Sequence, residues 1–267
     1  MPRYAGGPYG PGDTVEGVLV ASEPIERLRT LNGYLRYVDR SPSFSGAESY
    51  ASVEPLHEGP VDRDQEIPFA LRLPDDAYPN WEDPSTADYG TLSWSLVLEA
   101  DVQAGLDTIT THAIPVDTGG REWTGPPPTG EQEVKRQVDG WDVEVTPDRW
   151  ALRRGEELTV ALRIGKPKAE RPKLEVGVLC QAFYAVETKR PGESSYRREV
   201  NHVNLFEEWP PFDRAESVQT FTVRIPENAP FTYRGKAFGF NWSALAREKR
   251  RFFQSDAGRV ARLEVMP

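Results

Sequence analysis

The three histidines and the single cysteine are the residues best suited to metal binding or nucleophilic catalysis, and their spacing supports neither. His57, His112 and His202 form no His-x-x-x-His or His-Glu-x-x-His pattern, and Cys180 has no second cysteine with which to bind zinc. The sequence also lacks the Gly-x-Ser-x-Gly turn of many hydrolases and the glycine-rich loops that hold phosphates. A Ser-His-Asp triad can be built from distant residues without a local motif, but no residue of this sequence is singled out as its nucleophile. We therefore predict that the protein is not an enzyme and has no catalytic residue, cofactor or metal ion.

Three acidic clusters offer oxygen atoms of the kind that calcium binds. They lie at 62–66, 75–76 and 82–83, with Arg63 inside the first, and none has the spacing of an EF-hand loop. We interpret them as solvated turns. Seven tryptophans keep open an alternative function, that of a carbohydrate-binding module or a carbohydrate-active β-sandwich protein, although no pair of carboxylates is singled out for glycoside hydrolysis.

Aromatic residues in loops and one basic run are the candidate residues for binding a partner. Exposed aromatic side chains beside prolines can anchor an interface, although such side chains more often pack against their own domain. The basic run is interpreted as a solvated turn, with contact to an acidic partner or to lipid head groups as the sharper hypothesis. The candidates are Trp81, Trp209, Phe212, Arg247, Lys249, Arg250 and Arg251.

The net charge of −10 is unevenly distributed along the chain. Residues 1–118 carry seven Arg, no Lys and twenty Asp or Glu, a balance of −13, and residues 119–267 carry 25 basic and 22 acidic residues, a balance of +3. The first half would be repelled by nucleic acid and by anionic membranes, so we predict no nucleic-acid partner. The acidic surface is interpreted as an aid to solubility, with a docking face for a basic partner as the alternative.

Nothing in the sequence indicates export or membrane insertion. The first residues lack the charged and then apolar pattern of a secretory signal, and no apolar run reaches the ~18 residues of a membrane span. A single cysteine cannot form an internal disulfide, which favours a reducing compartment. We therefore expect a cytoplasmic protein whose partners are other proteins, with peripheral membrane contact through 247–251 as a further possibility.

Segments of the chain recur in the same order about 150 residues apart, at offsets of 143 to 152. Phe69–Ala77 resembles Phe221–Ala229, Gly12–Val18 resembles Gly155–Ala161, and Leu92-Ser93-Trp94-Ser95 resembles Phe240-Asn241-Trp242-Ser243. Repeats separated by this distance indicate two copies of one domain rather than a solenoid. Trp94 and Trp242 occupy matching positions and are predicted to lie in the two cores.

Alternating apolar and polar residues predict many short antiparallel strands and almost no helix. The fold class is predicted as all-β, with two tandem immunoglobulin-like antiparallel β-sandwich domains at 1–118 and 138–267 and a Pro/Gly-rich linker at 119–137. Strands are expected at 14–20, 31–38, 67–73, 91–99, 107–116, 141–145, 157–164, 174–187, 218–225, 236–245 and 259–266.

The repeated segments carry a resemblance to the arrestin-fold family that covers nearly the whole chain. Pro11–Val18 resembles the opening strand of the amino-terminal domain, and Leu73-Pro74 precedes an aromatic-centred strand at 89–94. In the second half, Ala229–Lys236 followed by Phe240-Asn241-Trp242 is similar to a strand entry of the carboxy-terminal domain. By size, the relatives with the greatest similarity would be microbial arrestin-like, sporulation-control proteins.

The resemblance implies two β-sandwich domains, each arrestin-like, and a role as a non-catalytic adaptor, scaffold or regulatory protein. The paired Arg and Asp of the polar core found in receptor-binding arrestins are not located in this sequence, so neither phosphate sensing nor receptor activation is carried over.

Overall fold

The computed structural model divides the chain into two compact units, each of which has its own buried core. One unit comprises Met1–Pro126 with Lys236–Phe238, and the other comprises Pro127–Gly235 with Gly239–Pro267. The change of unit after Pro126 falls inside the predicted linker. The structure describes residues 2–4, 6–51, 55–82, 86, 88–105, 107–118, 132–136, 143–165, 174–188, 197–213, 216–248 and 257–267.

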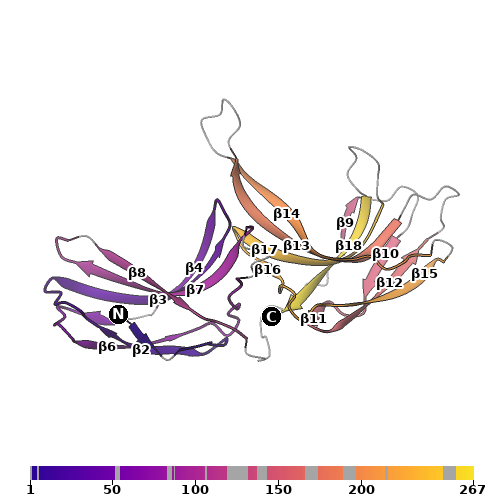
Figure 1. The fold of residues 1–267 in the computed structure, drawn as a ribbon. Coiled ribbons are helices and arrows are strands. Elements are labelled where there is room, and N and C mark those ends of the chain that lie inside the picture. Colours follow the sequence, from indigo (N-terminus) through magenta and orange to yellow (C-terminus); the bar gives the residue numbers. More distant parts are fainter. Residues whose placement is uncertain are drawn as a thin grey trace. The chain divides into compact units, whose positions relative to one another are not determined.

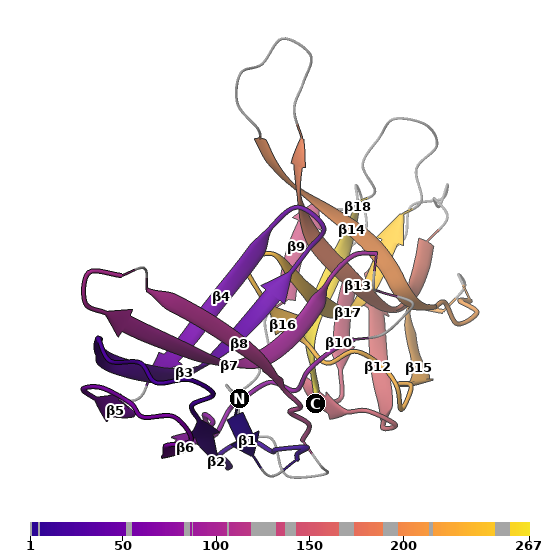
Figure 2. The ribbon, with the colours of Figure 1, turned by 60° about the vertical axis from the view of Figure 1, so that its left-hand side comes forward.

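The first unit is built from a three-stranded and a five-stranded sheet (Figures 1 and 2). The smaller sheet has the order β1 (Pro2–Tyr4), β2 (Thr14–Val20) and β6 (Glu66–Arg72). The larger has the order β4 (Ser45–Ala51), β3 (Leu28–Arg40), β7 (Thr91–Val102) and β8 (Thr108–Ile114), and β5 (His57–Glu58) also pairs with β3. All the pairings given for these strands are antiparallel.

The second unit repeats this plan with a three-stranded and a seven-stranded sheet. The smaller has the order β10 (Val143–Pro147), β12 (Glu157–Ile164) and β15 (Val218–Arg224). The larger has the order β11 (Ala151–Arg153), β18 (Ala257–Met266), β17 (Phe238–Glu248), β13 (Leu174–Thr188) and β14 (Arg197–Glu208). Strands β16 (Tyr233–Arg234) and β9 (Gln132–Arg136) pair with β17 and β18.

The all-β prediction is confirmed, because the residues that the structure describes form strands and turns and no helix. Strands β2 and β12 have the predicted bounds, whereas β17 continues to Glu248, past the predicted end at 245, so Arg247 lies on a strand and not in the predicted turn. Consequently no described segment is a helix that could span a membrane. The sequence did not predict β1, β4, β5, β9, β11, β14 and β16.

Strict alternation of side chains places the core of each unit between its two sheets. In β6, Ile67, Phe69 and Leu71 are buried while the residues between them are exposed, as a strand with one face on a core requires. In β12, Leu158 and Val160 are fully buried in the same way. The alternation read from the sequence therefore marks the faces correctly.

Each unit buries one of the two tryptophans that the repeat matched. Trp94 is 2% exposed and Trp242 is 1% exposed, which confirms their predicted place in the cores. The indole N–H of Trp94 donates to the carbonyl of Tyr78 at 2.7 Å, and that of Trp242 donates to the carbonyl of Pro230 at 2.8 Å. Tyr78 and Pro230 directly follow the repeated segments 69–77 and 221–229. The two copies therefore provide the acceptor for the tryptophan N–H at the same place in the repeat.

The turn that precedes the repeated strand is also built twice. The amide of Leu73 donates to the carbonyl of Asp13 at 2.8 Å, and the amide of Ile225 donates to the carbonyl of Glu156 at 2.9 Å. Next to these acceptors, Gly12 and Gly155 have φ angles of 75° and 81°, a region that favours glycine. The repeat in the sequence thus corresponds to a repeat in backbone geometry.

Candidate functional site

The outer face of the seven-stranded sheet holds a cleft with a mixed polar and apolar lining. The cleft has a volume of about 370 Å³ and is formed by side chains from five strands, β13, β14, β16, β17 and β18. Its lining combines arginines, amides, a histidine and apolar groups: Gln181, Phe183, Val200, His202, Arg234, Asn241, Trp242, Ser243, Val260 and Arg262.

Strand alternation and register explain why these side chains meet. Asn241 and Ser243 flank the buried Trp242 on β17, so they point away from the core. Ser243 is paired with Arg262 on β18. On the other side of the cleft, Phe183 on β13 is paired with His202 on β14, and directly opposed side chains of one sheet lie close together.

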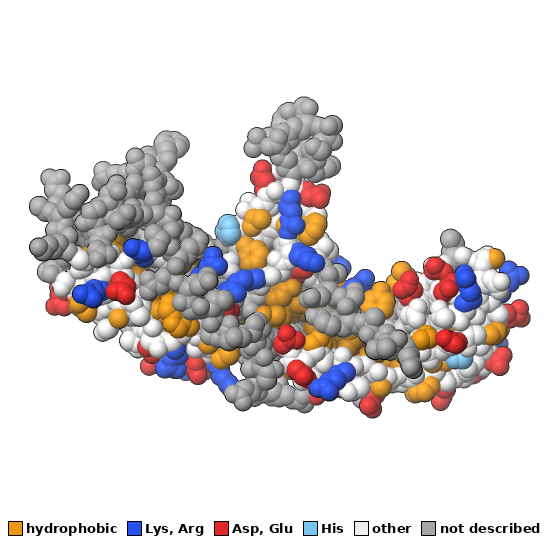
Figure 3. Space-filling view, turned by 180° about the vertical axis from the view of Figure 1, so that it is seen from behind, with side chains coloured by type: hydrophobic (Ala, Val, Ile, Leu, Met, Phe, Trp, Pro, Cys, Tyr) orange, Lys and Arg blue, Asp and Glu red, His pale blue; other side chains and the backbone are white. Residues whose placement is uncertain are grey.

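The cleft presents more cationic than anionic groups. Arg234 forms an ion pair with Glu264 at 2.5 Å, yet 47% of the Arg234 side chain stays exposed, and Arg262 is exposed as well. A guanidinium has five donors in a planar fork, so one carboxylate partner leaves donors for a second acceptor. In Figure 3, basic and acidic side chains lie close together below the tip of the projecting β13–β14 hairpin.

A second cluster occupies the same face and joins two of the predicted binding residues. The Arg247 guanidinium lies 4.2 Å from the centre of the Trp209 ring, within the range of a cation–π contact. Its Nη2 atom is also 3.1 Å from Oε2 of Glu175 on β13. The indole N–H of Trp209 donates to Glu207 at 2.8 Å.

Gly177 makes room for this cluster. A Cβ atom at Gly177 would lie 2.8 Å from the Trp209 ring and 2.2 Å from the Glu208 carbonyl oxygen, so a larger residue would push the tryptophan off the sheet. Arg247 is four residues after Ser243 and six after Asn241 on β17. Because side chains alternate along a strand, all three lie on the same face as the cleft. We call the surface formed by Phe183, Trp209, Arg234, Arg247 and Arg262 the arginine face.

The other predicted binding residues lie elsewhere. Trp81 is only 9% exposed, and its indole N–H donates to the Thr86 hydroxyl at 3.0 Å, so it packs within its own unit and offers no exposed platform. Phe212 is half-buried in the loop after β14. Lys249, Arg250 and Arg251 lie outside the described residues.

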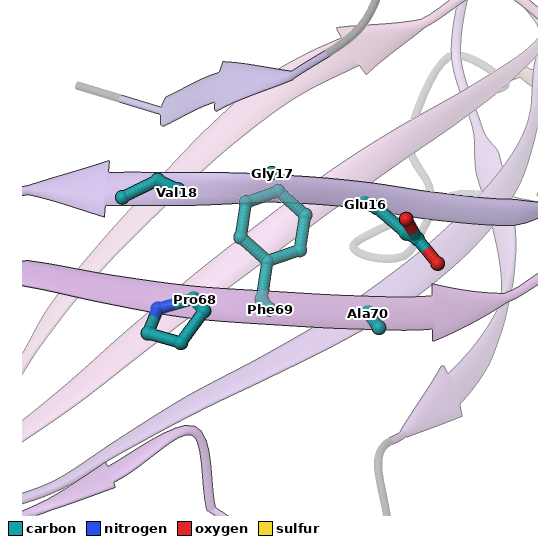
Figure 4. A pocket seen from close by; sticks show the side chains of 6 residues that line it. All are labelled: Glu16, Gly17, Val18, Pro68, Phe69 and Ala70. Atoms are coloured by element: carbon teal, nitrogen blue, oxygen red, sulfur yellow. The ribbon is translucent and has the colours of Figure 1, made fainter.

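A hollow on the first unit has a different character (Figure 4). It is a shallow depression of about 600 Å³ over β2 and β6, where Gly17 is paired with Phe69 and the phenyl ring lies across the glycine. Phe69 is buried on the core face of β6, so its ring covers Gly17 from the core side. Because Glu16 is the one charged residue in its lining, the depression offers little for orienting a ligand.

The cysteine and the remaining histidines belong to the scaffold. Cys180 is fully buried, and this burial raises the pKa of its thiol, which disfavours the reactive thiolate. His57 Nε2 lies 3.2 Å from the Pro60 carbonyl oxygen, and His112 is half-buried in β8. His202 is the histidine that reaches the cleft.

None of the residues that line the cleft was among the predicted site residues. Asn241 and Ser243 could have been placed on one face by the alternation around Trp242. His202 could not, because β14 was not recognised as a strand. Arg234 and Arg262 are separated from β13 by long stretches of sequence, and only the sheet order brings them together.

Comparison with known proteins assigns no family to this chain. It matches no protein-family model and no curated protein.

Proposed function

We propose that this protein is a non-catalytic adaptor or scaffold of the arrestin-like type, with two tandem β-sandwich domains, that binds an acidic segment of a partner protein at the arginine face. The observation that carries the proposal is the cleft on the second unit, where Arg234, Arg262 and His202 surround Phe183. Aromatic residues and arginines are the residue types that dominate binding energy at protein interfaces.

The kind of ligand follows from the donors in the cleft. Arg234, Arg262, Gln181 and Asn241 can all donate hydrogen bonds, and guanidinium groups bind carboxylates through paired N–H donors. Phe183 provides an apolar surface beside them. A peptide that alternates acidic and apolar side chains would satisfy both features.

The distribution of charge along the chain supports the same choice of partner. Residues 119–267 have a balance of +3, against −13 for residues 1–118. An acidic segment is therefore attracted to the second half and repelled by the first, and such steering raises association rates at low ionic strength.

Binding of a labelled acidic peptide tests the proposal. We expect a fluorescein-labelled dodecapeptide of Glu, Asp and Tyr to bind with a rise in anisotropy, and to bind more weakly as salt is added because the attraction is screened. Arg262→Glu should weaken binding by about tenfold or more, since a cation that contacts the ligand becomes a repelling anion.

Arg163→Glu is the matched control. Arg163 is exposed on β12, in the other sheet of the same unit, and the substitution changes the net charge by the same amount. Equal losses for Arg163→Glu and Arg262→Glu would show that only overall charge matters and would contradict binding at the arginine face. Saturable binding of a neutral glycan at the same cleft would instead favour the carbohydrate-binding alternative.

A further inference from the structure

Strand β8 forms an open edge of the larger sheet of the first unit. It pairs with β7 on one side, from Ala100↔Thr108 to Trp94↔Ile114, and no other strand of the described residues pairs with its other side. Thr108, Ile109, Thr110 and Thr111 are all exposed, so both faces of the strand are open to solvent along this stretch. Ile109, with 58% exposure, is among the most exposed large apolar side chains of the described residues.

Edge strands usually carry features that prevent another strand from pairing with them, and β8 carries neither charge nor proline. By contrast, the edge strand β6 contains Pro68 between Glu66 and Arg72, and proline has no N–H to donate. The edge strand β14 contains charged residues at 197–199 and 207–208. The sequence Thr-Ile-Thr-Thr of β8 consists entirely of β-branched residues, which favour extended pairing.

The charges around β8 indicate what kind of strand would pair with it. Asp107 directly precedes the strand, and Glu99 on β7 is the cross-strand partner of Ile109. Asp101 is already paired with Arg29 at 2.9 Å, and Nη2 of Arg36 lies 3.4 Å from the Thr111 hydroxyl. Glu99 and Asp107 are the acidic residues beside this edge, and Asp107 Oδ1 also accepts from the Val102 amide at 3.4 Å. Both would attract cationic side chains, in a half of the chain with a balance of −13.

A second copy of this chain is the obvious competing occupant, because β8 could pair with itself. Such pairing would bring two regions of −13 together, and like charges placed across an interface oppose association. We propose that β8 accepts an extended segment of a partner protein that carries Lys or Arg at alternate positions. The added strand would take its backbone hydrogen bonds from the open edge and its charge contacts from Glu99 and Asp107.

This surface is separate from the arginine face, since it belongs to the first unit and selects a ligand of opposite charge. The probe is the octapeptide Lys-Val-Lys-Thr-Lys-Val-Lys-Thr, and the readout is hydrogen exchange of the full chain with and without it. We expect slower exchange of amides within Thr108–His112, because the amides that point outward become hydrogen-bonded. A copy of the peptide with an N-methyl group at every residue, which keeps the charge but has no backbone N–H to donate on either edge, should give no protection.

Substitutions separate strand pairing from general electrostatics. Ile109→Lys places a cation on the edge and should weaken binding by about tenfold or more, as lysine on an edge strand is expected to do. Val218→Lys is the control, because Val218 is 59% exposed on the edge strand β15 of the other unit, and it should leave binding unchanged.

Three results would overturn the proposal. One is equal protection of β8 by a peptide with Glu in place of Lys, and another is binding of the basic peptide without any protection at 108–112. The third is a concentration-dependent dimer in light scattering whose formation protects β8, because the occupant would then be a second copy. None of these results depends on whether the acidic peptide binds the arginine face.

Discussion

Two buried tryptophans make the clearest residue-scale prediction, because each has one polar atom and one acceptor for it. Trp94→Phe or Trp242→Phe would leave the carbonyl of Tyr78 or Pro230 without its indole donor. We expect each substitution to lower the free energy of unfolding by about 1–3 kcal/mol from the lost hydrogen bond, with a further loss from the smaller ring.

Urea denaturation followed by circular dichroism measures this effect, with Trp209→Phe as the control. Trp209 is half-buried on a sheet face and its ring contacts Arg247, so its replacement should cost less than about 1 kcal/mol. A Trp94→Phe protein as stable as the parent would show that the indole hydrogen bond contributes nothing to the first core.

Trp81 and Trp209 show why burial of a single residue is hard to predict from sequence. Both lie next to prolines or polar turns, and both were candidates for an exposed platform. Trp81 exchanges backbone hydrogen bonds with Leu92, at 2.9 and 3.1 Å, which draws it into the core of its unit. Trp209 instead lies over Gly177, with Arg247 above its ring. These partners are distant in sequence, so local composition could not distinguish the two residues.

At the scale of elements, the duplicated turn before β2 and β12 gives a second prediction. Gly12 and Gly155 have positive φ angles of 75° and 81°, and an L-residue in that region costs roughly 1–2 kcal/mol. We expect Gly155→Ala to be destabilising by about this amount. Gly12→Ala should cost at least as much, because its Cβ would also lie 2.7 Å from Oδ1 of Asp75.

Thermal unfolding monitored by calorimetry checks the pair, with Gly6→Ala as the control. No atom lies within 4 Å of a Cβ placed on Gly6, so this variant should unfold like the parent. If Gly155→Ala were as stable as Gly6→Ala, the left-handed turn would not be a requirement of the repeated motif.

Strands with one buried and one exposed face are the clearest in the sequence. β6 and β12 alternate cleanly, so the period of two identifies both the strand and its buried side. β14 was missed because most of its described residues are exposed, so no apolar alternation marks it, and a bulge interrupts its pairing with β13 at Cys180/Gln181. The cleft depends on β14, which is why its composition could not be derived from the sequence.

At the scale of the whole molecule, the internal repeat accounts for the fold better than for the chemistry. The copies share a turn and a tryptophan hydrogen bond, and an ion pair between Arg72 and Asp75 at 2.6 Å recurs as Arg224 and Glu227 at 3.5 Å. Their charges have diverged to −13 and +3 in the two halves of the chain. The shared features stabilise each sandwich, and the differences lie on the surfaces that we propose bind partners of opposite charge.

Separate cores lead to the last prediction, which uses Cys180 as a reporter of the second unit. The thiol is fully buried, and burial raises its pKa, so a thiol reagent should react only when the second unit opens. We expect the labelling rate in mild urea to rise in Trp242→Phe, which weakens the core around Cys180. Trp94→Phe weakens the first core by the same chemistry and should leave the rate unchanged. Equal acceleration by the two substitutions would show that both halves unfold as one cooperative structure, and that the duplication no longer gives independent folding units.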